Sequence, residues 1–197
     1  MAWGIILMGI KHCGKSTQGR MLGKDLGAPF YDTDTVIKKI SGKSPREIFL
    51  EEGKDGFMEK EKDACFAIAQ EIEEKQIKKV VIATGGGICN NQRALEILRP
   101  LGTFVFMDVS KETATKRILR EIIYTKDKKM KNLPAYIGRK SPKTEDDVAR
   151  IFGDFYDSRR KLYKSLCDIS CPLDGGTPLE NKTVILEAVR NQNIMLK

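Results

Sequence analysis

The sequence predicts an α/β protein, a three-layer sandwich in which a five-stranded parallel sheet lies between two layers of helices. Short apolar runs alternate with longer segments of helical periodicity, which is typical of β/α units. A glycine-rich segment joins the first apolar run to the first helix, and three consecutive glycines follow the third run. Open α/β sheets bind ligands at the edge where their strands end, so these glycines indicate a binding site.

Length and charge suit one domain with anionic ligands. The 197 residues can bury a full core, and we expect residues 1–197 to form a single domain. The formal net charge of +8 fits anionic ligands, although it also fits a lysine-rich surface whose lysines alternate with acids. No aromatic residues interleave with a basic stripe, so we expect no nucleic-acid partner.

Other compositional features exclude several classes. No apolar run approaches the length of a membrane span, and the N-terminus lacks a signal-peptide pattern. We therefore expect a cytoplasmic protein without a membrane partner. A monomer is expected as well. The five cysteines are scattered and the chain has one histidine, which argues against a zinc site and a disulfide framework.

The first glycine-rich segment, residues 9–17, has the form G-x-x-x-x-G-K-[ST] of a phosphate-binding loop. A strand is predicted before it at residues 3–8, and a helix after it at residues 15–26. This arrangement directs backbone N–H groups at a phosphate near the positive end of the helix. Lys15 would reach the β- and γ-phosphates of a nucleoside triphosphate, and the Ser16 hydroxyl would ligate Mg²⁺. The expected nucleotide-binding residues of the loop are Gly9, Cys13, Gly14, Lys15, Ser16 and Thr17.

The second predicted strand, residues 28–31, ends in the acids Asp32 and Asp34. Carboxylates at positions i and i+2 of an extended strand point the same way. In a phosphate-loop enzyme this favours one acid near the metal and one facing the substrate. The alternative is an Asx turn, in which either acid caps the helix predicted over residues 35–40.

An acid is also predicted on the inner face of a helix. A capping-box pattern at Ser44 and Glu47 starts a helix that runs through Leu50. Two glycines interrupt it, and a longer helix is predicted over residues 57–74. Glu61 falls inside the apolar arc of that helix, where a carboxylate needs a partner or a pocket.

The third strand, residues 79–84, leads directly into Gly85, Gly86 and Gly87. Three glycines at a strand end let another molecule approach the backbone closely. Asn90 or Asn91 then caps a helix.

The fourth strand, residues 103–108, ends in Asp108, which resembles a magnesium-binding acid and competes with Asp32 for that role. A helix follows from Ser110 to about Tyr124. Residues 125–143 are lysine-rich and contain two prolines, so we interpret them as a mobile lid with a broken helix inside it.

The last long helix is predicted over residues 145–166, with Arg159 close to the centre of its apolar stripe. Glu61 and Arg159 therefore both face inward, as a structural ion pair, a pocket wall, or both. A fifth strand at residues 169–171 and a helix at residues 179–189 complete the five β/α units. The stripe consists of Val148, Ile151, Phe152, Phe155, Leu162, Tyr163 and Leu166.

Taken together, these residues resemble the shikimate kinase family, small phosphate-loop kinases with a fold like that of nucleoside-monophosphate kinases. The resemblance covers almost the whole chain. It implies an ATP-dependent, Mg²⁺-requiring phosphotransferase that converts shikimate to shikimate 3-phosphate in aromatic amino-acid biosynthesis. Residues 33–62 would form a substrate-binding helical region, and residues 125–143 the lid. The residues that carry the resemblance are the phosphate loop with Gly19 and Arg20, residues 30–34 and 44–49, Glu61, the triple glycine, Arg117 and residues 159–163.

The resemblance also implies roles at the substrate. Asp34 would hold and deprotonate the attacking hydroxyl. Gly85, Gly86 and Gly87 would line the substrate together with Glu61, and Arg159 would clasp its carboxylate. At the nucleotide, Asp32 would hold Mg²⁺ through water and Arg117 would lie against adenine, whereas Asp108 has no metal role in the family.

Two positions depart from the family pattern. Met58 stands where the family usually has an arginine that helps Arg159 grip the carboxylate. The family lid carries an Arg-Pro-Leu-Leu signature, whereas residues 132–135 read Asn-Leu-Pro-Ala. The lid arginine that stabilises the transferring phosphate is thus unassigned, with Arg120, Lys131 and Arg139 as candidates. The alternatives to a shikimate kinase are a related kinase for gluconate or a nucleoside monophosphate, and a non-catalytic nucleotide-binding module.

Overall fold

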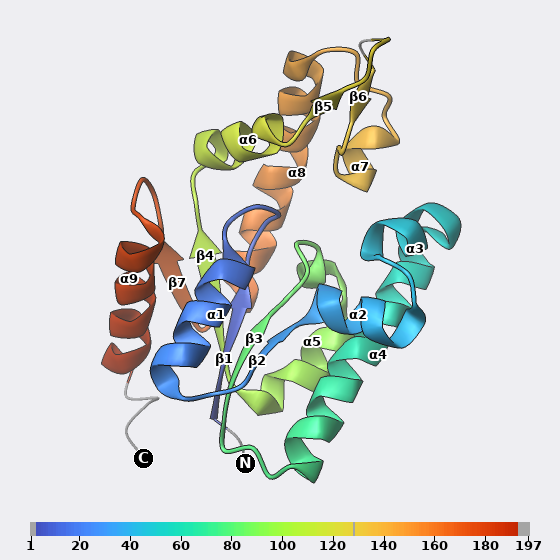
Figure 1. The fold of residues 1–197 in the computed structure, drawn as a ribbon. Coiled ribbons are helices and arrows are strands. Elements are labelled where there is room, and N and C mark those ends of the chain that lie inside the picture. Colours follow the sequence, from blue (N-terminus) through green and yellow to red (C-terminus); the bar gives the residue numbers. More distant parts are fainter. Residues whose placement is uncertain (1–2, 128, 193–197) are drawn as a thin grey trace.

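The computed structural model describes residues 3–127 and 129–192. Five parallel strands form its central sheet in the order β2-β3-β1-β4-β7, which confirms the predicted sheet (Figure 1). Helices α1 and α9 pack together on one side of the sheet, and α8 runs behind it. The strands are β1 (Trp3–Met8), β2 (Phe30–Asp32), β3 (Lys79–Ala83), β4 (Thr103–Asp108) and β7 (Ile169–Pro172).

The helices begin largely where the sequence places start signals. Capping boxes open α3, α8 and α9, and Asn91 caps α5 through a bond from the Ala94 N–H to its side chain. The α-helices are α1 (Lys15–Leu26), α2 (Thr33–Ser41), α3 (Pro45–Glu51), α4 (Gly53–Glu74), α5 (Gln92–Leu98), α6 (Lys111–Arg120), α7 (Ala135–Gly138), α8 (Glu145–Leu166) and α9 (Pro178–Asn191), with 3₁₀ turns η1 (Ile88–Asn90) and η2 (Arg99–Leu101).

The largest differences from the prediction concern two helix boundaries and one buried position. Helix α4 begins at Gly53 rather than at residue 57, because Gly53 takes a left-handed φ of 76° at the α3–α4 junction. Gly56 permits the tight junction, since a Cβ there would lie 2.4 Å from the Cβ of Glu52. Helix α6 ends at Arg120 instead of near Tyr124, and Leu162 of the predicted buried stripe is 37% exposed.

The segment expected as a lid contains more structure than the sequence predicts. Strand β5 (Ile123–Tyr124) pairs antiparallel with β6 (Met130–Lys131), and α7 packs against α3 and α8. Lys128, between these strands, lies outside the described residues. None of the helices within the two described ranges is long and apolar enough to cross a membrane.

Two hydrophobic clusters hold the elements around the carboxyl ends of the strands. The main core fills both faces of the sheet and includes the ring of Tyr163, stacked on Phe106 at 5.2 Å. A smaller cluster of Ile37, Ile48 and Ala64 joins α2, α3 and α4. Burying each of these side chains contributes about 1 to 3 kcal/mol. This second cluster holds the first turn of α2 and the middle of α4 at the ends of the central strands.

Candidate active site

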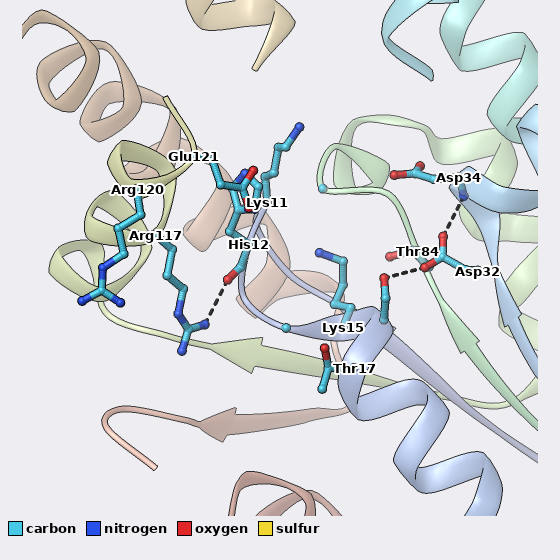
Figure 2. A pocket seen from close by; sticks show the side chains of 13 residues that line it. Lys11, His12, Lys15, Thr17, Asp32, Asp34, Thr84, Arg117, Arg120 and Glu121 are labelled. Atoms are coloured by element: carbon cyan, nitrogen blue, oxygen red, sulfur yellow. Dashed lines mark hydrogen bonds and ion pairs between the residues drawn. The ribbon is translucent and has the colours of Figure 1, made fainter. Parts of the chain in front are cut away.

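A cavity of about 540 Å³ opens at the carboxyl ends of the strands, between the phosphate loop, the start of α2 and the end of α6 (Figure 2). It brings together most of the predicted nucleotide residues and both acids of the second strand end. Gly9, Cys13, Gly85, Gly87, Glu61 and Arg159 lie outside its walls. The lining residues are Lys11, His12, Gly14, Lys15, Ser16, Thr17, Asp32, Asp34, Thr84, Gly86, Arg117, Arg120 and Glu121.

The phosphate loop depends on its glycines. Gly14, the N-cap of α1, has a left-handed φ of 100°, and Gly9 has a φ of 152°. A Cβ on Gly9 would also lie 2.8 Å from the Cys13 sulfur. The Lys15 ammonium is buried and donates to the carbonyls of Gly9 and Ile10, both at 2.9 Å. The glycines thus hold the backbone in the shape of a phosphate-binding loop, and Gly14, Lys15 and Ser16 line the cavity.

Two oxygen donors that could hold Mg²⁺ lie at the start of α1 and at the end of β2. The Ser16 hydroxyl donates to the Asp32 carboxylate at 2.5 Å, and both residues line the cavity. Asp32 also caps α2, since its other oxygen accepts from the Asp34 N–H at 3.0 Å. Hydroxyl and carboxylate oxygens are hard donors of the kind that Mg²⁺ prefers, so the residues present fit this ion.

The prediction that Asp32 and Asp34 both extend from a strand end was wrong, although both acids line the cavity. Asp34 lies in the first turn of α2 and not on an extended strand. The Asx cap weighed as an alternative forms as well. Desolvation by the surrounding residues raises the pKa of Asp34 above its ordinary value, and the nearby Asp32 charge adds to this, while Lys15 and Lys11 oppose it.

Asp108, the alternative magnesium-binding acid to Asp32, is bonded to an arginine. Its two carboxylate oxygens accept from Nε and Nη2 of Arg160 at 2.7 and 2.8 Å. Such bidentate pairs are among the stronger charge-assisted contacts. Asp108 does not line the cavity.

Glu61 and Arg159 lie on either side of the triple glycine. A Cβ on Gly85 would be 2.7 Å from a Glu61 oxygen, and a Cβ on Gly87 would be 3.8 Å from Arg159 Nη2. No ion pair joins the two side chains among the described residues. Arg159 instead donates to the Gly86 carbonyl at 3.2 Å and lies over the ring of Tyr136 at 4.7 Å. Glu61 and Arg159 therefore flank the three glycines without forming an ion pair with each other.

The Glu61 carboxyl is an unusual buried acid. It is 1% exposed, one oxygen accepts from Asn91 Nδ2 at 2.9 Å, and the other has no hydrogen-bond partner among the described residues. Burial raises its pKa from 4.5 to about 7. Asn91 also donates to the Met58 carbonyl at 2.8 Å, so this one amide holds Met58 and Glu61 of α4 together. The sequence indicated Asn91 only as a helix cap.

The free energy of unfolding should therefore depend on Glu61 between pH 4.5 and 7. The unfolded chain loses this proton first, so the wild-type protein loses on the order of 3 kcal/mol as pH rises through this window. Glu61→Gln removes the titration and should flatten that part of the profile. Urea midpoints at pH 5 and 8 measure it, with the exposed Glu74→Gln as the control. Identical pH dependence in wild type and Glu61→Gln would contradict the buried-acid assignment.

Arg117, His12 and Glu121 line the end of the cavity beside α6, where the resemblance places the nucleotide base. Arg117 lines it and donates to the His12 carbonyl at 2.9 Å. His12 has a left-handed φ of 64°, and its Nδ1 lies 3.1 Å from a Glu121 oxygen. Burial and the neighbouring cations lower the pKa of His12 to about 4, so the ring is neutral near pH 7 and its contact with Glu121 is not an ion pair.

The three candidates for the lid cation lie apart. Arg120 lines the cavity, and Lys131 is exposed on β6. Arg139 donates to the Phe49 carbonyl at 2.8 Å and lies over that ring, which ties α7 to α3. The sequence reasoning overlooked Lys11, which lines the cavity from the third position of the phosphate loop.

This fold and site define a phosphate-loop phosphotransferase with an alcohol acceptor: a phosphate loop follows β1, and a hydroxyl, the acid bonded to it and a second acid beside that one line the same cavity. The family model for shikimate kinase matches residues 11–189. The chain belongs to the shikimate kinase family.

Individual relatives agree. A shikimate kinase from Aquifex aeolicus is 35% identical over 159 residues, covering 81% of this chain and 80% of that protein. One from Syntrophus aciditrophicus is 30% identical over 83% of this chain and 79% of its own. The solved structure of shikimate kinase from Acinetobacter baumannii in complex with shikimate superimposes with a TM-score of 0.78 at 25% identity, over 100% of this chain and 97% of that one.

Proposed function

We propose that this chain transfers the γ-phosphoryl group of ATP to a hydroxyl of shikimate, giving shikimate 3-phosphate and ADP. The observation that carries the proposal is that one cavity is lined by Lys15, Ser16 and Asp32 and also by Asp34, which lies beside Asp32. Phosphoryl transfer needs positioning and charge neutralisation more than covalent help, and this arrangement supplies both.

The acceptor hydroxyl meets Asp34. The carboxylate accepts a hydrogen bond from that hydroxyl and takes its proton as the new bond to phosphorus forms. The bond between the γ-phosphorus and the bridging oxygen breaks, and its electron pair leaves with ADP. The raised pKa of Asp34 makes it a better base than an ordinary aspartate at the same geometry.

Lys15 and the loop N–H groups bind the nonbridging phosphate oxygens, and Gly9, Cys13, Gly14 and Thr17 shape that cradle. Ser16 and Asp32 would hold Mg²⁺, which neutralises phosphate charge when bound. Arg117 lies where the base would stack. Glycine is needed at positions 9 and 14 because both have a positive φ, and a Cβ on Gly9 would lie 2.8 Å from the Cys13 sulfur.

The acceptor's carboxylate binds at the other side of the triple glycine. Arg159 is held there by the Gly86 carbonyl and by the rings of Tyr136 and Phe155. Glu61 orients this wall through Asn91. Guanidinium groups bind carboxylates in bidentate geometry, which favours an anionic acceptor.

A coupled ADP-release assay tests the function directly. Shikimate, gluconate and the nucleoside monophosphates are offered as acceptors with ATP and Mg²⁺, and we expect turnover with shikimate. Turnover with gluconate or a nucleotide alone would identify a related kinase. Turnover with none of them, together with retained ADP binding, would identify a nucleotide-binding module.

Met58 provides a sharper test of the acceptor. It is half-buried on α4, one turn from Glu61, where the family has an arginine. If the acceptor is shikimate, Met58→Arg should add a charge-assisted contact and lower KM for shikimate about tenfold to a hundredfold. Met58→Gln, of similar length and without charge, is the matched control. An already low wild-type KM that Met58→Arg leaves unchanged would mean that another cation holds the carboxylate.

We further propose that residues 1–197 act as one kinase domain with the substrate region at residues 33–62 and a mobile lid at residues 125–143. The protein works as a cytoplasmic monomer without nucleic-acid or membrane partners. Light scattering of the purified chain tests the monomer, and a mass of two or more chains would contradict it.

A further inference from the structure

None of the three candidates for the lid cation lies beside Asp34. Arg139 is engaged with Phe49, and Lys131 is exposed on β6 away from the cavity walls. Arg120 lines the cavity, but Figure 2 shows its side chain on the far side of Arg117 from Asp34. The cation that would face the transferring phosphate therefore has to come from another element.

Lys11 is in a suitable place. It lines the cavity together with Lys15, Asp34 and Gly86. A Cβ on Gly86 would lie 2.8 Å from the Lys11 backbone nitrogen, so the absence of a side chain at Gly86 lets the phosphate loop touch the triple-glycine loop. This contact fixes Lys11 between the nucleotide-binding loop and the loop that faces the acceptor. Figure 2 shows Lys11 extending from the phosphate loop into the open space across which Asp34 lies, whereas the Lys15 ammonium turns back toward the loop carbonyls.

The Lys11 ammonium is also uncommitted. It makes no hydrogen bond or ion pair with any residue in the described ranges, whereas Lys15, Arg117 and Arg159 each donate to backbone carbonyls. The charges acting on it come from several elements. Burial lowers the pKa of Lys11, Asp34 and Glu121 raise it, and Arg46 and Lys15 lower it. Lys11 is therefore within electrostatic reach of both Asp34 and Lys15, the groups that flank the transferred phosphorus.

We propose that Lys11 is a second catalytic lysine of the phosphate loop, which donates hydrogen bonds to a nonbridging γ-oxygen during transfer to the acceptor. This rests on the proposed kinase function. As the acceptor oxygen bonds to phosphorus and the bridging bond breaks, its electron pair moves to ADP and the hydroxyl proton moves to Asp34. Charge on the γ-oxygens and the leaving oxygen is redistributed in this step, and a cation placed there lowers the barrier.

Kinetics test the role. Lys11→Met removes the charge and keeps the length of the side chain. It should lower kcat by about a hundredfold while changing KM for ATP and shikimate less than about threefold, because the contact strengthens only in the transition state. Lys11→Arg should restore most of kcat. The same charge removed at Lys24→Met, exposed near the far end of α1, is the control and should have no effect.

Binding supplies a readout that does not need turnover. Lys11→Met should bind ADP with Mg²⁺ as the wild type does, but should lose about tenfold or more in affinity when aluminium fluoride is added as a mimic of the transferring phosphoryl group. This result stands even if shikimate proves not to be the acceptor, so failure of the two proposals can be told apart. Three results would overturn the role of Lys11: an unchanged kcat, a loss confined to KM for the acceptor, or a larger kcat loss in Arg120→Met than in Lys11→Met.

Discussion

Replacing Lys15 by alanine is expected to reduce kcat at least a thousandfold, equivalent to about 4 kcal/mol of transition-state stabilisation. Lys15 is 8% exposed, and its ammonium lies inside the loop, 2.9 Å from two backbone carbonyls. Alanine leaves those carbonyls without a donor and removes the charge beside the β- and γ-phosphates. Lys11 lies elsewhere on the loop and cannot replace it.

Two measurements separate lost catalysis from a damaged loop. Thermal unfolding of Lys15→Ala, compared with wild type, reports how far the internal hydrogen bonds of Lys15 stabilise the fold. Lys24→Ala on the same helix is the matched control and should keep full turnover. If Lys15→Ala retained more than about a tenth of wild-type turnover, a loss below 1.4 kcal/mol, this loop would not be the catalytic one.

Asp34→Asn should lower kcat by a factor of about 10² to 10⁴ and leave KM for ATP nearly unchanged. The amide has the shape of the carboxylate but cannot accept the hydroxyl proton. Because the pKa of Asp34 is raised, wild-type kcat should fall as pH decreases through that pKa, where the base becomes protonated. In Asp34→Asn this acidic limb should disappear.

The neighbouring acids serve as comparisons for Asp34. Asp32→Asn should raise the Mg²⁺ concentration needed for half-maximal activity, since Asp32 is bonded to Ser16. Asp108→Asn should leave that requirement unchanged, because Asp108 is paired with Arg160 outside the cavity. A magnesium phenotype in Asp108→Asn and none in Asp32→Asn would show that these two assignments are reversed.

Local patterns in the sequence determined the elements and the nucleotide end of the site. The order of glycine, lysine and serine in residues 9–17 specifies a loop whose function depends on short-range backbone geometry. Apolar runs and capping signals located the strands of the sheet and most helix starts. The inward position of Glu61 followed from helical periodicity, which depends only on neighbours along the same helix.

Tertiary structure decided which distant side chains meet. Glu61 and Arg159 both face inward, yet Glu61 accepts from Asn91 and Arg159 donates to Gly86. The pairing of Asp108 with Arg160, which distinguishes it from Asp32, joins residues of β4 and α8. The two-residue strands β5 and β6 are too short to give a periodic signal. Lys11 becomes a candidate only because Gly86 brings the triple-glycine loop against it. Such contacts depend on how packed helices set distances of a few ångströms, and spacing along the chain does not encode those distances.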